Sequence, residues 1–106
     1  MRETILVTGS TDGIGLASAR MLVSQGHYVL LHGRNPEKLD EVERTLYQLP
    51  GGGRVESYLA DLSRMADVGA LAKAVIKKHA KLDVLINNAG NQVGYISLRM
   101  SFSDLV

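Results

Sequence analysis

The stretch of sequence that decides the fold runs from Ile5 to Met21 and reads ILVTGSTDGIGLASARM. Its start is apolar and β-branched, which predicts a buried strand over 4–8. The pattern that follows predicts a helix over 14–25. Three glycines lie between the two elements: Gly9, Gly13 and Gly15. Such a turn either needs glycine for a positive φ angle or lets a phosphate group approach the backbone.

Strands and helices alternate beyond this stretch. The order β-α-β-α-β-α-β predicts a parallel sheet with right-handed crossovers. We therefore expect an α/β fold of the Rossmann type, three layers deep, with strand order 3-2-1-4. The further elements that the sequence predicts are a strand over 27–33, a helix that Pro36 opens, a strand over 54–62, a helix that Ser63 caps and a strand centred on Val84–Ile86.

Length and composition narrow the class of protein. The chain has 106 residues, enough for one small domain, and its net charge of +1 gives no reason to expect nucleic acid or an anionic membrane as a partner. No run approaches the roughly 20 apolar residues of a membrane span. The chain has no cysteine, which excludes disulfides and thiolate zinc sites and fits a cytoplasmic protein. Three histidines lack metal-ligand spacing and are expected on the surface or in loops: His27, His32 and His79.

The sequence around the three glycines fits a phosphate-binding loop, because a strand precedes them and a helix follows. Gly9 permits a tight turn. Gly13 leaves no Cβ between the backbone and a pyrophosphate, and Gly15 lets the helix pack close to the sheet. The N–H groups at the helix start would then face the anion. The predicted loop comprises Gly9, Ser10, Thr11, Asp12, Gly13, Ile14 and Gly15.

Three motifs at the ends of predicted strands resemble those of the short-chain dehydrogenase/reductase family. They are T-G-x-x-x-G-x-G over 8–15, Asp61-Leu62, and Asn-Asn-Ala-Gly over 87–90. The resemblance covers 1–90 and implies the NAD(P)-binding half of a Rossmann-type fold, without the C-terminal half of the family fold. The phrases TDGIG and LLHGRN look like those of retinol-dehydrogenase-type relatives.

The resemblance also implies roles for residues after the third and fourth strands. Asp61 would receive the adenine amino group, and Leu62 would line the adenine pocket. Asp61 has a second, compatible interpretation as an acid that favours the following helix dipole. Asn87 would tie neighbouring strands together. Three residues would lie against the cofactor ribose: Asn88, Ala89 and Gly90.

The end of the second strand bears on which nicotinamide cofactor binds. An NAD site usually has an acid there to hold the ribose 2′-hydroxyl. Here Arg34 and Asn35 follow the strand, and no carboxylate appears before Glu37. Arg34 can pair with a 2′-phosphate, which favours NADP over NAD, unless it is only a solvated loop residue. Asp12 argues against NADP, because some NADP-dependent relatives have a cation at that place.

The family transfers hydride with a serine, a tyrosine and a lysine, the last two in a Y-x-x-x-K pattern. That pattern is absent, and the near match Tyr95 with Arg99 follows the Asn-Asn-Ala-Gly motif too closely. We therefore predict no catalytic residue in this chain. The expected function is an NADP-dependent oxidoreductase by ancestry, in a truncated form. The alternatives are a non-catalytic NADP-binding module and an interaction protein that needs a partner chain.

Residues 91–106 depart from the family pattern. Apolar and polar residues alternate from Ile96 to Ser103, which indicates a strand. A strand over 95–103 could pair antiparallel with the fourth strand, whereas the alternative is a disordered end. An unpaired fourth strand would leave an open edge that recruits a second copy or another chain.

Overall fold

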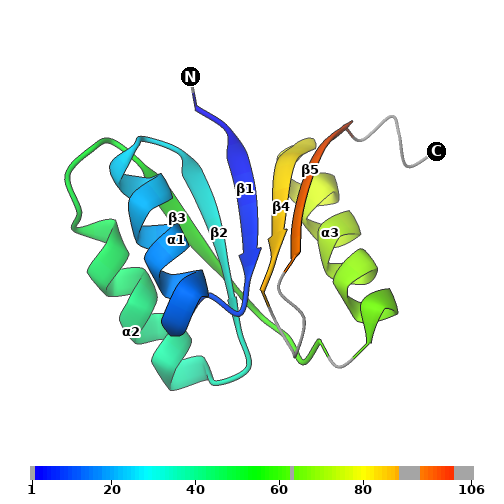
Figure 1. The fold of residues 1–106 in the computed structure, drawn as a ribbon, viewed down its shortest axis with the longest axis horizontal. Coiled ribbons are helices and arrows are strands. Elements are labelled where there is room, and N and C mark those ends of the chain that lie inside the picture. The colour runs from blue at the N-terminus through cyan, green and yellow to red at the C-terminus, as the bar shows by residue number, and fades with distance from the viewer. Residues whose placement is uncertain (1, 63, 89–93, 102–106) are drawn as a thin grey trace.

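The computed structural model describes residues 2–62, 64–88 and 94–101. They form one sheet with the strand order β3-β2-β1-β4-β5, in which the first four strands are parallel (Figure 1). This confirms the predicted order 3-2-1-4. The elements are β1 (Thr4–Thr8), α1 (Gly13–Ser24), β2 (Tyr28–Gly33), α2 (Pro36–Tyr47), β3 (Arg54–Leu59), α3 (Met65–His79), β4 (Lys81–Asn87) and β5 (Gly94–Ser101).

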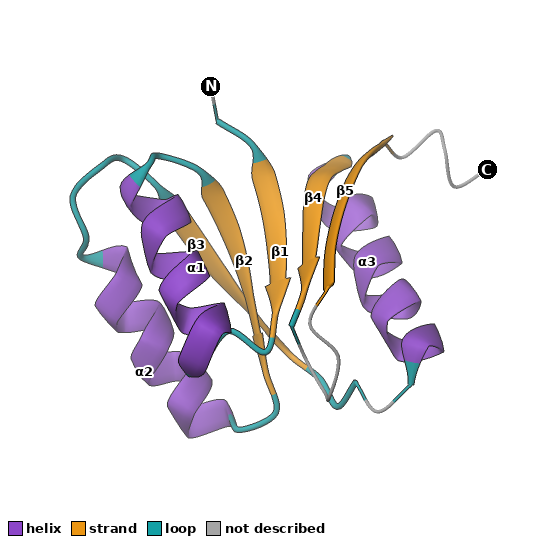
Figure 2. Ribbon diagram, in the orientation of Figure 1, coloured by secondary structure: helices purple, strands orange, loops and turns teal. Residues whose placement is uncertain are grey.

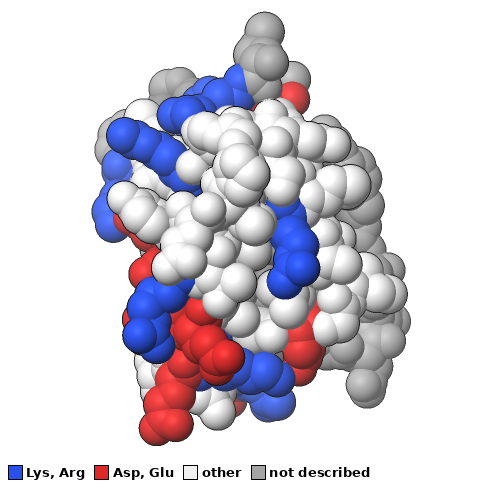
Figure 3. All heavy atoms as spheres, turned by 90° about the vertical axis from the view of Figure 1, so that its left-hand side faces the viewer, with Lys and Arg blue, Asp and Glu red and all other residues white. Residues whose placement is uncertain are grey.

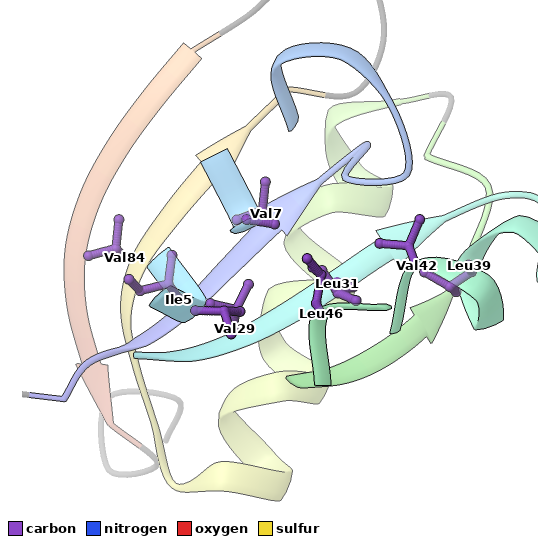
Figure 4. Packing of buried hydrophobic residues seen from close by; sticks show 10 residues of the cluster. Ile5, Val7, Val29, Leu31, Leu39, Val42, Leu46 and Val84 are labelled. Carbon is purple, nitrogen blue, oxygen red and sulfur yellow. The ribbon is translucent and has the colours of Figure 1, made fainter. Parts of the chain in front are cut away.

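The three layers follow from the alternation of side chains along the strands. Ile5 and Val7 of β1 pack with α1 and α2, whereas Leu6 between them packs with α3. Figure 2 shows α1 and α2 together on one face of the sheet and α3 on the other. Figure 4 shows the core on the α1 and α2 side, where Val29 and Leu31 of β2 lie beside Ile5 and Val7. Both faces of the central strands are therefore buried, as the sequence pattern predicts.

The helix starts differ in how they are capped. The Asn35 side chain accepts hydrogen bonds from Glu37 N (3.0 Å) and Lys38 N (3.1 Å), and Pro36 opens α2 as predicted. The prediction that Ser63 caps the third helix is wrong, because the N-cap is Arg64. Its backbone N–H donates to Asp67 Oδ2 (3.0 Å), which closes the first turn of α3 one residue later than expected. Ser63 itself lies outside the described residues.

The tail contributes a fifth strand. Over 94–101 the structure has the strand and not the disordered end: β5 runs antiparallel to β4 from Asn87↔Gly94 to Lys81↔Ser101. The register shifts between Leu82 and Val84. The tail therefore pairs antiparallel with the fourth strand, the first of the two alternatives, and covers the edge of β4 that would otherwise be open. Phe102 and Ser103, at the end of the predicted strand, lie outside the described residues.

Candidate functional site

The glycine loop joins β1 to α1 at the carboxyl ends of the strands (Figure 1). Gly9 and Gly13 have φ angles of 61° and 55°, a region that glycine occupies without strain. A Cβ added at Gly13 would meet no atom within 4 Å, so the space in front of this residue is open. A Cβ at Gly15 would clash with the carbonyl of Gly9 and lie 2.6 Å from Asn88 Nδ2. Gly13 thus leaves room for a ligand, and Gly15 permits close packing.

The start of α1 is suited to an anion. Asp12 occupies the N-cap in an extended conformation, but its side chain makes no capping hydrogen bond. The first bond of the helix runs from Leu16 N to Asp12 O (3.1 Å). The amides of the turn before Leu16 are the ones that α-helices leave without an intrahelical acceptor. They face the helix N-terminus, where an anion is favoured.

Polar side chains tie the loop to β4. Asn88 N donates to Thr8 Oγ1 (2.9 Å), and Thr8 Oγ1 donates to Asn87 Oδ1 (2.8 Å), so Asn87 joins neighbouring strands as expected. The Asn88 side chain donates through Nδ2 to the carbonyl of Gly9 (3.0 Å). This contact was not predicted. This bond fixes the first glycine of the loop to the residue that follows β4. Ala89 and Gly90 lie outside the described residues.

His32 corrects the expectation that the histidines lie on the surface or in loops. It lies in β2 and is only 2% exposed. Its Nδ1 accepts from Gly9 N (2.9 Å), and its Nε2 lies 2.8 Å from Ala60 O. His79, the last residue of α3, is partly buried, with a side chain 12% exposed. The signal that could have found His32 is its place at the end of a buried strand, two residues before Arg34.

The end of β2 carries the residues predicted to choose the cofactor. Arg34 and Asn35 are exposed, and the Arg34 guanidinium makes no hydrogen bond or ion pair with a residue that the structure describes. Thr11 lies close by, because a Cβ on Gly33 would be 2.7 Å from Thr11 Cγ2. The glycine loop and the end of β2 therefore meet. Asn35 uses its side-chain oxygen to cap α2.

Asp12 has a partner that the sequence did not reveal. Its Oδ2 lies 2.9 Å from Lys38 Nζ in the first turns of α2, and both side chains are exposed. The acid that argues against a 2′-phosphate is thereby paired with a cation. Arg34 and Lys38 are two cations close to the end of β2, and Lys38 is paired with Asp12. Glu37 and Asp61 are the acids nearby.

The residues after β3 lie at the same edge of the sheet. Asp61 is exposed, and Leu62 packs partly buried against the core on the α3 side. Asp61 is close enough to His32 to act on its ring electrostatically.

Ser10 connects the glycine loop to β2, since its N–H donates to His32 O (2.9 Å). Ile14 is 65% exposed at the start of α1.

Outside the glycine loop, the described residues form a further hollow and a surface of mixed charge. An open hollow lies between the end of α2 and the start of β3, and is lined by Glu43, Arg44, Tyr47, Gln48, Val55 and Glu56. No group of three or more His, Asp or Glu side chains in the described residues could hold a metal ion. No helix within the described ranges has the length and apolar character needed to cross a membrane. On the face in Figure 3, basic and acidic side chains are interspersed and form no basic stripe.

The fold is a Rossmann-like α/β fold with a glycine loop between its first strand and its first helix. The chain matches the family model for short chain dehydrogenase over residues 3–105. It belongs to the short-chain dehydrogenase family, a class of oxidoreductases that bind a nicotinamide cofactor.

Three known proteins illustrate the likeness. The chain is 43% identical over 86 residues to the short-chain dehydrogenase chry4 of Gibberella zeae, covering 81% of this chain and 31% of that protein. A metagenomic short-chain oxidoreductase solved with NADP is 44% identical, with a TM-score of 0.72 over 84% of this chain and 39% of that one. L-Sorbose reductase from Gluconobacter frateurii, solved with NADPH and L-sorbose, is 32% identical, with a TM-score of 0.73 over 84% and 34%. The chain spans about a third of the length of the curated relatives it matches.

Proposed function

We propose that this chain is the cofactor-binding part of an NADP-dependent oxidoreductase. The observation that carries the proposal is the glycine loop. Its positive-φ glycines, the open space in front of Gly13 and the uncapped start of α1 together form a cradle for a pyrophosphate. When bound, a nicotinamide cofactor would give or accept a hydride.

The residues of this chain would bind and orient the cofactor. The loop from Gly9 to Gly15 would hold the pyrophosphate, Asp61 and Leu62 would hold the adenine, and Asn88, Ala89 and Gly90 would lie against a ribose. The loop fits a pyrophosphate because the space in front of Gly13 is open, and a side chain at this residue would fill it. His32 and Asn88 keep the loop in position from two sides, through the Gly9 amide and the Gly9 carbonyl.

We further propose that NADP is preferred over NAD. Arg34 is exposed beside the loop and is not paired with another described side chain, so a 2′-phosphate could take it as a partner. Lys38 pairs with Asp12, so the carboxylate that would repel a 2′-phosphate beside the loop has a cation as its partner. The two solved relatives named above were crystallised with NADP or NADPH, which supports the same preference.

The Y-x-x-x-K pattern that the family uses in hydride transfer does not occur in the sequence of this chain. None of its tyrosines is followed four residues later by lysine: the residues there are His32, Gly51, Leu62 and Arg99. We therefore propose that the chain alone binds the cofactor without turning over a substrate.

The test has two stages on the full chain. Calorimetric titration with NADP and NAD measures binding, and the consumption of NADPH in the presence of carbonyl compounds measures turnover. Binding without turnover is expected. Turnover by this chain alone would contradict the second part of the proposal, and turnover only after a second polypeptide is added would favour a protein that needs a partner chain.

A further inference from the structure

His32 lies where the glycine loop, β2 and the residues after β3 meet, and each of its polar atoms has a partner. The backbone N–H donates to Ser10 Oγ (2.9 Å), and the carbonyl accepts from Ser10 N (2.9 Å). The ring nitrogen Nδ1 accepts from Gly9 N (2.9 Å), and Nε2 lies 2.8 Å from Ala60 O. One buried side chain therefore joins the loop that would hold the pyrophosphate to the strand end that would hold the adenine.

The two ring partners fix the protonation state of the imidazole. The Gly9 N–H can only donate, so Nδ1 must offer a lone pair. The Ala60 carbonyl can only accept, so Nε2 must carry the hydrogen. Only the neutral Nε2–H tautomer satisfies both. A second proton would place an N–H at Nδ1 directly against the N–H of Gly9.

The surroundings of the ring favour this neutral form. Burial lowers the pKa of His32, and the positive charge of Arg34 lowers it further, against the opposing effects of the Ala60 carbonyl and of Asp61. From the glycine loop, the uncharged Gly9 and Ser10 bind His32. Tyr58, its neighbour across the β2–β3 register, directs its hydroxyl to Glu56 Oε2 (2.9 Å).

We propose that His32 is a positioning residue that holds the glycine loop in its phosphate-binding form only while its imidazole is neutral. Protonation removes the acceptor of the Gly9 amide and sets two N–H groups against each other. The loop then shifts, and cofactor affinity falls as the pH drops through the range in which His32 takes up a proton, which burial places below that of an exposed histidine. This inference rests on the proposed function, since it concerns the same loop.

The test follows cofactor affinity with pH. The full chain is titrated calorimetrically with NADP and with NAD from about pH 7.5 down to about pH 4.5, because the lowered pKa of His32 moves its protonation below the range of an exposed histidine. NAD is essential, because a 2′-phosphate itself changes charge near about pH 6. We expect the dissociation constants of both cofactors to rise by about threefold to tenfold, the effect of losing one hydrogen bond. Circular dichroism at each pH checks that the chain stays folded.

Two variants assign the effect to the ring. His32→Asn keeps an acceptor near the position of Nδ1 but cannot take up a proton in this range, so its affinity for NAD should not change with pH. The matched control is His27→Asn. His27 Nδ1 also accepts a backbone N–H, from Glu3 (3.0 Å), but at the opposite end of β2. This control should keep the pH dependence of the wild type.

A readout without cofactor keeps the inference testable if His32→Asn does not fold. The ¹⁵N resonances of the wild-type imidazoles report which nitrogen carries the proton, and we expect the Nε2–H tautomer of His32 at about pH 7.5. A ring that is protonated on Nδ1 there, or NAD binding by the wild type that does not vary with pH, would overturn the inference alone. Failure of the wild type to bind either cofactor at about pH 7.5 would overturn the proposed function, and the inference with it.

Discussion

The side-chain amide of Asn88 donates to the carbonyl oxygen of Gly9 over 3.0 Å, which fastens the end of β4 to the first glycine of the loop. Asn88→Ala removes this donor and leaves a partly buried carbonyl without its partner. We expect the affinity for NADP to fall by about threefold to tenfold, the range for one hydrogen bond. Calorimetric titration measures it, and Gln48→Ala, an exposed amide at the end of α2, is the control. Equal affinities in all three proteins would show that the contact does not shape the site.

The charges beside the loop should set the preference for NADP. Arg34→Ala should weaken NADP binding by about 1–3 kcal/mol while leaving NAD binding nearly unchanged, because only NADP carries the 2′-phosphate. Lys38→Gln should act in the same direction but by less than about 1 kcal/mol, since this lysine is exposed and already paired with Asp12. Lys73→Gln, an exposed lysine of α3, is the control. An unchanged ratio of the two affinities in Arg34→Ala would remove that residue from the site.

Gly13 and Gly15 should respond differently to a side chain. Gly13→Val places its side chain in open space, so the fold should survive with a strain of about 1–2 kcal/mol from the positive φ angle. Cofactor binding should be lost, because the valine occupies the space that the pyrophosphate needs. Gly15→Ala should instead lower thermal stability, because its Cβ meets the Gly9 carbonyl. Normal NADPH binding by a folded Gly13→Val protein would reduce the loop to an ordinary turn.

Removal of β5 should change how the chain associates. Without residues 94–106, β4 loses its antiparallel partner and presents an unpaired apolar edge. The shortened chain should form dimers or aggregates, which light scattering detects, and should melt at a lower temperature. A monomeric product with an unchanged melting temperature would show that β5 does not protect the edge of β4 from association.

Acid should loosen the contact between β3 and the end of α3. Burial opposes ionisation of Glu56, but hydrogen bonds from Lys78, His79 and Tyr58 outweigh it and lower the pKa of this carboxyl. A carboxyl with a lowered pKa stabilises the fold above its unfolded pKa and loses that contribution as pH falls through the folded one. Thermal melts at decreasing pH should therefore show a loss of stability that is smaller in Glu56→Gln. An identical pH profile in the variant would contradict this account.

Much of the fold could be predicted because each element carries its own local pattern. The strand Thr4–Thr8, the start of α2 at Pro36 and the strand order follow from apolar alternation, turn residues and chain connectivity. The sequence of the tail permits either a strand or a disordered end, because alternation of apolar and polar residues does not by itself form a strand. Pairing with β4 decides for the strand over 94–101. The cap of α3 was misplaced by one residue because Ser63 and Arg64 are neighbours, and the deciding contact comes from Asp67.

The contacts that hold the site together could not be predicted in the same way. His32 reaches Gly9 and Ala60, which are 23 and 28 residues away in the sequence, and Lys38 reaches Asp12 over 26 residues. Such contacts depend on how far each strand extends relative to its neighbours. No local pattern records that relation, so only the folded chain brings the partners together.

The measurement that tests the central claim most directly is a calorimetric titration of the full, folded chain with NADP, repeated with NAD. Our account predicts saturable binding of one NADP per chain, with a higher affinity than for NAD. A chain that circular dichroism shows to be folded but that binds neither cofactor would contradict it.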